Sequence, residues 1–166
     1  MTPPLTIRSM TSEDWPEVRR IYEEGIATGT ASFETDVPDW PTWNAGHLPG
    51  CRIVAESSGS IAGWAALMPV SARECFRGVA EVSVYVGTAV RGAGVGRALL
   101  EALIPASEAD GIWTLWSSIH ADNRASLALH ERCGFRMIGR RKRIAKRGGI
   151  WADTWNMERR SAVVGI

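Results

Sequence analysis

The sequence has few cysteines and no long apolar run, and both shortages narrow the class of protein. Its three cysteines lack CxxC spacing and stand beside only three histidines, which argues against a disulfide framework and against a zinc site. Cys133 falls in a helical pattern and is expected to be a buried thiol. No stretch of about 20 apolar residues and no secretion signal is present. These features predict a cytoplasmic protein that binds no metal.

Positive and negative residues are nearly equal in number over the whole sequence, but they are distributed unequally between its two halves. The formal net charge of +1 argues against a uniformly basic nucleic-acid binder and against a strongly acidic disordered chain. Residues 1–83 carry six arginines, no lysine and eleven acidic residues, a net charge of −5, whereas residues 84–166 carry +6. This asymmetry indicates an anionic partner for the C-terminal half, with ordinary variation of surface charge as the alternative.

Apolar patterning predicts one domain over residues 1–166 in which strands and helices alternate irregularly. Strands are expected at 5–10, 51–57, 60–70, 79–87 and 112–119, and in a closing hairpin on either side of a turn at 146–149. Helices are expected from Thr11 to about Gly25, after Asp39, and at 94–110 and 125–135. This order predicts a mixed α/β (α+β) domain with a central, mostly antiparallel sheet flanked by helices.

The most informative segment is a glycine-rich loop between a strand and a helix. It reads Arg91-Gly92-Ala93-Gly94-Val95-Gly96-Arg97. Glycines let backbone N–H groups approach a ligand, and a helix N-terminus adds free donors and a positive dipole end. The loop lacks the Gly-Lys-Ser/Thr of a Walker A motif and the glycine spacing of a dinucleotide fingerprint. It therefore predicts a pyrophosphate cradle between Arg91 and Arg97, with a ligand-free turn as the alternative.

The R-G-x-G-x-G loop opening a helix resembles the acetyl-CoA-binding motif of the GNAT superfamily of N-acetyltransferases. Asn123-Arg124-Ala125-Ser126 follows the next strand as it does in that family, and Leu129–Phe135 is similar to the family's "LHexxGF" segment. A closing hairpin completes a resemblance that covers nearly the whole chain. It implies the GNAT fold and acetyl-CoA as co-substrate.

Two further segments, Glu81–Val86 and Thr30–Glu34, resemble the phosphinothricin acetyltransferase branch, which includes the methionine sulfoximine and methionine sulfone acetyltransferases. The resemblance implies direct acetyl transfer to the α-amine of a small amino acid or a toxic analogue, by a homodimer. The chain departs from the branch at Val82, where His is common, and in a shortened loop at 73–78. Acetylation of a protein N-terminus or another amine, and a non-catalytic acyl-CoA-binding module, are the alternatives.

The resemblance also implies roles for residues of the site. Glu81 is the expected general base, acting through water, with a solvated strand carboxylate as the alternative reading. His130 stands where many relatives have a proton-donating Tyr; a cofactor contact and a buried helix residue are its other readings. The backbone N–H of Val86 is expected to polarise the thioester carbonyl. The full set of residues expected to bind the cofactor is Val84, Tyr85, Val86, Arg91, Gly92, Ala93, Gly94, Val95, Gly96, Arg97, Asn123 and Ser126.

For the acceptor, Arg73 and Arg77 are expected to form a fork for a carboxylate, with Phe33 as an apolar wall. Asn123 has capping of the following helix as an equal alternative to cofactor binding. The basic run at 140–147 reads as a solvated face, a contact for the cofactor 3′-phosphate or a dimer surface. It is short and has no interleaved aromatic residues, so nucleic-acid binding is not expected.

Overall fold

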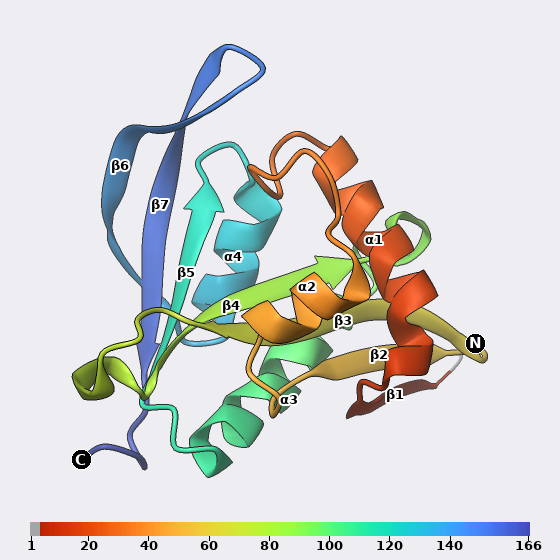
Figure 1. Ribbon diagram of the computed structural model, residues 1–166, viewed down its shortest axis with the longest axis horizontal. Coiled ribbons are helices and arrows are strands. Elements are labelled where there is room, and N and C mark those ends of the chain that lie inside the picture. Colours follow the sequence, from red (N-terminus) through yellow and green to blue (C-terminus); the bar gives the residue numbers. More distant parts are fainter. Residues whose placement is uncertain (1–3) are drawn as a thin grey trace.

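The computed structural model describes residues 4–166, and within them seven strands form one sheet in the order β1-β2-β3-β4-β5-β7-β6. All neighbouring pairs are antiparallel except β4 and β5, which are parallel. The predicted mixed, mostly antiparallel sheet is confirmed (Figure 1). The strands are β1 Leu5–Ser9, β2 Ile53–Ser57, β3 Ser60–Pro69, β4 Val79–Val86, β5 Thr114–His120, β6 Arg136–Arg147 and β7 Ile150–Arg160.

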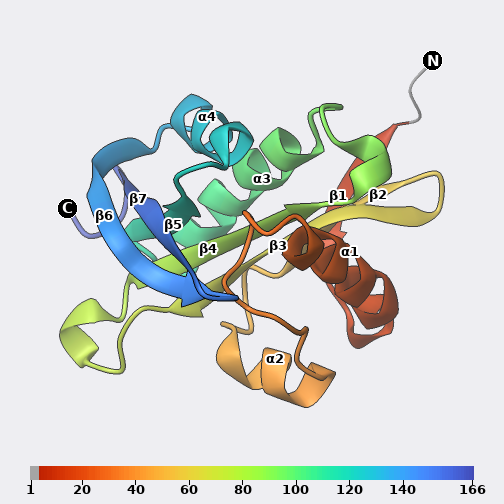
Figure 2. The same cartoon turned by 90° about the horizontal axis from the view of Figure 1, so that it is seen from above.

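Helices cover both faces of the sheet. They are α1 Trp15–Ala27, α2 Trp40–Gly46, α3 Val95–Ala109 and α4 Arg124–Arg132, with short 3₁₀ turns at Ser12–Asp14, Glu74–Phe76 and Thr88–Val90. Figure 2 shows α1 and α2 on one face and α3 and α4 on the other. Among the described residues, no helix has the length and apolar character needed to cross a membrane.

The helix boundaries follow local chemistry. The Thr11–Asp14 capping box expected from the sequence is present, and Asp39 accepts a hydrogen bond from the Thr42 N–H at 3.0 Å to start α2. Pro105 lies in the last turns of α3 without ending it. Gly134 has a φ of +85° just after α4, as expected for a left-handed helix end.

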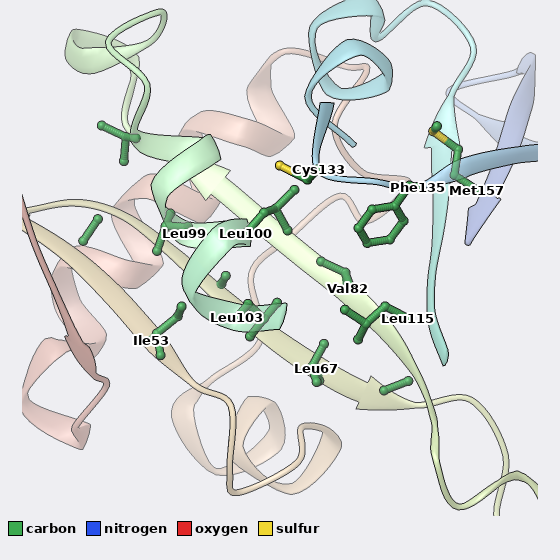
Figure 3. Close-up of a cluster of buried hydrophobic side chains, with 14 of the residues drawn as sticks. Ile53, Leu67, Val82, Leu99, Leu100, Leu103, Leu115, Cys133, Phe135 and Met157 are labelled. Atoms are coloured by element: carbon green, nitrogen blue, oxygen red, sulfur yellow. The ribbon is translucent and has the colours of Figure 1, made fainter. Parts of the chain in front are cut away.

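Two apolar cores result. One packs Leu99, Leu100 and Leu103 of α3 against Leu67 and Leu115 of the sheet (Figure 3). It also holds the Cys133 thiol, which confirms the expected burial. The other core lies under α1 and α2 and contains Trp43 and Trp64. Because both faces of β3 are covered, the seven residues 61–67 are all buried.

The feature that positions the site is the short parallel pairing of β4 with β5. Only Val79–Glu81 pair with Thr114–Trp116, and the strands then diverge (Figure 1). Beyond Glu81, the backbone groups of β4 that face away from β3 have no strand partner. A gap is thereby opened in the middle of the sheet, with donors and acceptors along its edge.

Candidate active site

A cleft of about 1250 Å³ occupies the gap between the diverging strands. It is lined on one side by the loop that follows α1, and on the other by the start of α3 and by α4. Residues 81–86 of β4 and 116–120 of β5 form its walls. The volume is large enough for two ligands to meet within one enclosure.

Glu81 lies at the bottom of the divergence. It is the last β4 residue in parallel register, opposite Trp116, and it lines the cleft. Its half-buried position raises the pKa of the carboxyl, because burial disfavours the charged form, while the positive charge of Arg141 acts in the opposite direction. A raised pKa makes this carboxylate a stronger base than an exposed one, and its place in the cleft lets it meet a bound ligand.

The glycine loop lies between β4 and α3, as the sequence predicted. Gly92 and Gly94 have φ values of +81° and +84°, and Gly94 is the residue that precedes α3. A Cβ at Gly96 would lie 3.0 Å from Cδ2 of Leu129, so this glycine permits the close approach of α3 and α4. The first turn of α3 therefore presents free N–H groups to the cleft.

Most of the loop, though not all of it, reaches the cleft. Its lining members are Arg91, Gly92, Gly94, Val95, Gly96 and Arg97, whereas Ala93 is not among them. The Arg97 Nε donates to the Glu101 carboxylate at 2.7 Å, so part of its charge is neutralised. Arg91 contacts the backbone oxygen of Val86 at 3.4 Å.

Strand β4 presents different groups to its two sides. Val84, Tyr85 and Val86 all line the cleft, and Val84 and Val86 also pack against the α3 core. The Tyr85 ring turns to the opposite face, where it stacks 4.8 Å from Trp64 and its hydroxyl donates to the Ala31 oxygen at 3.2 Å. Tyr85 thus supports the loop that walls the cleft, while its backbone lies at the strand edge.

Asn123 caps helix α4, one of the two roles that the sequence left open. Its Oδ1 accepts from the Ser126 N–H at 3.1 Å, and its Nδ2 donates to the Thr30 oxygen at 3.3 Å. Asn123 and Ser126 both line the cleft. The residue therefore joins the two sides of the site as well as starting the helix.

His130 lines the cleft but is only 1% exposed. Its Nδ1 lies 2.8 Å from the backbone oxygen of Ser126, and since a carbonyl only accepts, Nδ1 carries the proton. Nε2 has no hydrogen-bond partner, and burial lowers the pKa of the imidazole. The geometry favours a neutral ring with an unprotonated Nε2.

Of the three residues predicted to bind the acceptor, the structure places one in the cleft and two outside it. Phe33 lines the cleft, with its ring 5.8 Å from that of His120. Arg73 and Arg77 lie outside the lining, in the β3–β4 connection. Their guanidinium carbons lie 5.3 Å from the rings of Phe76 and Trp113 respectively.

Sequence reasoning missed the contribution of β5 and β6. Trp116, Ser118 and His120 line the cleft, and their alternation with buried residues in β5 was a signal that could have identified them. Arg141 was noted only within a basic run, yet its guanidinium carbon lies 5.6 Å from the Trp116 ring. No group of three metal-ligating side chains occurs among residues 4–166.

Comparison with known proteins places this cleft in context. Residues 7–135 match the acetyltransferase (GNAT) family. The chain is 37% identical to a phosphinothricin N-acetyltransferase of Alcaligenes faecalis, over 93% of this chain and 81% of the relative. It is 31% identical to an L-methionine sulfoximine/L-methionine sulfone acetyltransferase of Pseudomonas paraeruginosa, over 92% of both chains.

A solved structure agrees with these relatives. The crystal structure of a GNAT superfamily phosphinothricin acetyltransferase from Sinorhizobium meliloti in complex with AcCoA superposes with a TM-score of 0.87 and 28% identity. The superposition covers 99% of this chain and 91% of that one. The likeness therefore extends over the whole fold, cleft included.

Proposed function

This chain belongs to the acetyltransferase (GNAT) family and is an acetyl-CoA-dependent N-acetyltransferase, and we propose that its acceptor is the α-amine of a small amino acid or a toxic analogue. Phosphinothricin, methionine sulfoximine and methionine sulfone are the acceptors named for its relatives. The observation that carries the proposal is the half-buried Glu81 carboxyl where β4 and β5 separate.

The half of the cleft beside α3 and α4 fits acetyl-CoA. The left-handed glycines and the free N–H groups of α3 suit a pyrophosphate, with Arg91 and Arg97 beside it. In this proposal the backbones of Val84 and Tyr85 pair with the pantetheine amides along the free strand edge. The Val86 N–H polarises the thioester carbonyl, and Asn123 and Ser126 complete the site from α4.

Glu81 is the proposed general base. An ammonium group is no nucleophile, so the amine must lose a proton before it attacks the thioester carbon. Glu81 accepts that proton through a water molecule. The new N–C bond forms as the C–S bond breaks, and the electron pair of that bond leaves on sulfur.

His130 is proposed to donate a proton to the departing thiolate. Because Nε2 is unprotonated in the neutral ring, this role requires that Nε2 first takes up the second proton lost by the amine nitrogen, after the N–C bond has formed, and then passes it to the thiolate. His130→Asn should then lower kcat by about tenfold or more at saturating substrates. Unchanged turnover by a folded His130→Asn enzyme would show that His130 donates no proton and has only a packing role.

Phe33 is proposed as the apolar wall of the acceptor pocket, which it lines. A carboxylate fork of Arg73 and Arg77 requires the β3–β4 connection to turn toward the cleft, because both guanidinium groups now lie over aromatic rings outside it. If Arg73→Ala and Arg77→Ala both leave the KM for amino acids unchanged, the fork fails.

A homodimer is proposed from the apolar surface of the β6–β7 hairpin. Its exposed apolar side chains include Ile150 at 75% and Trp151 at 54% exposure, more than a solvated hairpin needs. Light scattering on the purified protein measures this directly, with a mass near 36 kDa as the expected result, about twice that of one chain.

A thiol-release assay with acetyl-CoA and a panel of acceptors tests the proposed function. The panel contains phosphinothricin, methionine sulfoximine, methionine sulfone, common amino acids, simple amines and peptides with free N-termini. Turnover is expected with the amino acids and analogues. Turnover with peptides alone would indicate a protein N-terminal acetyltransferase, and acetyl-CoA binding without turnover would indicate a binding module.

A further inference from the structure

The basic run of the β6–β7 hairpin contains one guanidinium that differs from its neighbours in what it contacts. Arg140 donates to the Asp153 carboxylate at 2.8 Å, and Arg147 donates to the backbone oxygens of Ile26 and Ser32. Arg141 has no ion pair or hydrogen bond within the described part of the chain. Its guanidinium carbon instead lies 5.6 Å from the ring centroid of Trp116, a residue that lines the cleft.

The register of the sheet places Arg141 on the same face as Glu81. Arg141 pairs with Thr154, Thr154 pairs with His120, and Trp116 pairs with Glu81. Paired residues direct their side chains to one face, and residues two or four apart on a strand share that face. The side chains of Glu81, Trp116, His120 and Arg141 therefore lie on a common face, although Arg141 is not itself among the lining residues.

An irregularity in β6 follows Arg141 directly. The register between β6 and β7 shifts between Arg141 and Ala145, and Arg143 has a φ of +51°. Such a bulge bends a strand and redirects its side chains. After the bulge, Ile144 and Ala145 line the cleft, so β6 at this point runs along the acceptor half.

The charges of Arg141 and Glu81 influence each other without being paired. The positive charge of Arg141 lowers the pKa of Glu81 against the effect of burial, yet the two groups form no ion pair within 4.0 Å. A positive group beside the Trp116 ring and the negative group of Glu81 thus lie on the same face of the sheet, next to the cleft that Glu81 and Trp116 line. Two groups of opposite charge that lie on one face without pairing with each other suit an acceptor that carries both an amine and an anionic group.

We propose that Arg141 binds an anionic group of the acetyl acceptor while Glu81 faces its amine, and that this pair selects zwitterionic amino acids over simple amines. The inference rests on the proposed function and deepens it. A guanidinium offers two parallel N–H donors that fit either a carboxylate or a phosphinate. Phosphinothricin carries both a carboxylate and a phosphinate, whereas methionine sulfone carries only the α-carboxylate.

Arg141→Met tests the proposal with Arg141→Lys as the conservative variant. Lys142→Met is the matched control, because it removes an equal charge from the adjacent position without touching Trp116. KM and kcat are measured for phosphinothricin and methionine sulfone, on the alkaline plateau where Glu81 is ionised in every variant. The Kd for acetyl-CoA and the Tm report on folding and on the cofactor half of the cleft.

Arg141→Met is expected to raise the acceptor KM by about tenfold or more and to change kcat by less than about twofold. Arg141→Lys should recover part of the loss, and Lys142→Met should match the wild type. A rise for both acceptors assigns Arg141 to the α-carboxylate, and a rise for phosphinothricin alone assigns it to the side-chain anion.

Two results would overturn the inference. An unchanged KM for both acceptors in Arg141→Met, with the wild type active on them, removes Arg141 from the acceptor site while leaving the proposed function intact. A loss confined to the Kd for acetyl-CoA would assign the residue to a cofactor phosphate instead. A wild-type enzyme inactive on every amino acid overturns the proposed function, and this inference with it.

Discussion

Glu81 in β4 and Trp116 in β5 are the last residues held in parallel register before the two strands separate. The carboxyl therefore stands where the sheet ends and the cleft begins. The adjacent edge of β4 offers free backbone groups, and the glycine loop follows the same strand. One short pairing thus places the Glu81 carboxyl, the free backbone groups of β4 and the start of α3 around a single cleft, a geometry that suits the proposed direct transfer between two bound reactants.

The position of Glu81 is expected to reduce stability. Burial raises the pKa of its carboxyl above that in the unfolded chain, so the native state holds the proton more tightly. This tighter proton binding adds to the free energy of unfolding below the pKa of the unfolded chain, and the gain is lost as the pH rises through the pKa of the folded protein. The ionised carboxylate is therefore destabilising at alkaline pH. Glu81→Gln should therefore raise the Tm by about 2 °C at pH 8.

Thermal unfolding of wild type and Glu81→Gln across pH measures this effect. The difference in Tm is expected to close toward acid pH, where Glu81 is protonated in both states. A lower Tm for the variant throughout the pH range would contradict a destabilising buried charge.

Gly94 is expected to be needed for its backbone conformation. Its φ is +84°, and a Cβ would meet no atom within 4 Å, so any loss in Gly94→Ala arises from the backbone alone. The left-handed region costs an L-residue about 1–2 kcal/mol, so urea unfolding should show a loss of that size. Titration should show weaker acetyl-CoA binding, because the first turn of α3 shifts.

Gly46→Ala is the control for this substitution. Gly46 has open space around its α-carbon and no positive φ, so the exchange should be neutral or stabilising by up to about 1 kcal/mol. Equal losses at the two glycines would show that the conformation of Gly94 is not what matters.

The two loop arginines are expected to contribute unequally to acetyl-CoA binding. Arg97 is ion-paired with Glu101 at 2.7 Å, whereas Arg91 is paired with no carboxylate in the part of the chain described. Arg91→Met should therefore raise the Kd for acetyl-CoA by about tenfold, and Arg97→Met by about twofold. Titration at increasing NaCl should also weaken binding, and less steeply in Arg91→Met. A larger effect at Arg97 would reverse the assignment.

Arg147 is expected to hold the wall of the acceptor pocket. Its guanidinium donates to the Ile26 oxygen at 3.1 Å, in the last turn of α1, and to the Ser32 oxygen at 3.3 Å, in the loop that follows. Figure 2 shows the hairpin end beside the loop between α1 and α2. Arg147→Met should lower the Tm by about 2–4 °C and speed hydrogen exchange in residues 28–36. Lys146→Met, which removes a cation over the exposed Trp151, should do neither.

The sequence was sufficient where the controlling interactions are local. The glycine loop, the capping at Asp39 and the closing hairpin all depend on neighbouring residues, and each is present as predicted. The burial of Cys133 followed from helical periodicity in the same way.

The relation between Arg141 and Glu81 was not predictable in this way. The two residues are 60 positions apart, and they share a face only because β4 pairs with β5, β5 with β7, and β7 with β6. The short pairing of β4 with β5 likewise joins segments distant in the sequence, and no local pattern reports where it ends. The positions of Arg73 and Arg77 depend on the β3–β4 connection, where periodicity gives no guidance.

The most direct test of the central claim compares kcat/KM for an amino-acid acceptor in wild type and Glu81→Gln across pH, with the Kd for acetyl-CoA as the control. We predict a loss of about 100-fold or more at pH 8 and the disappearance of the acid limb, with the Kd unchanged. A kcat/KM near the wild-type value over the whole pH range would contradict the assignment of Glu81 as the base.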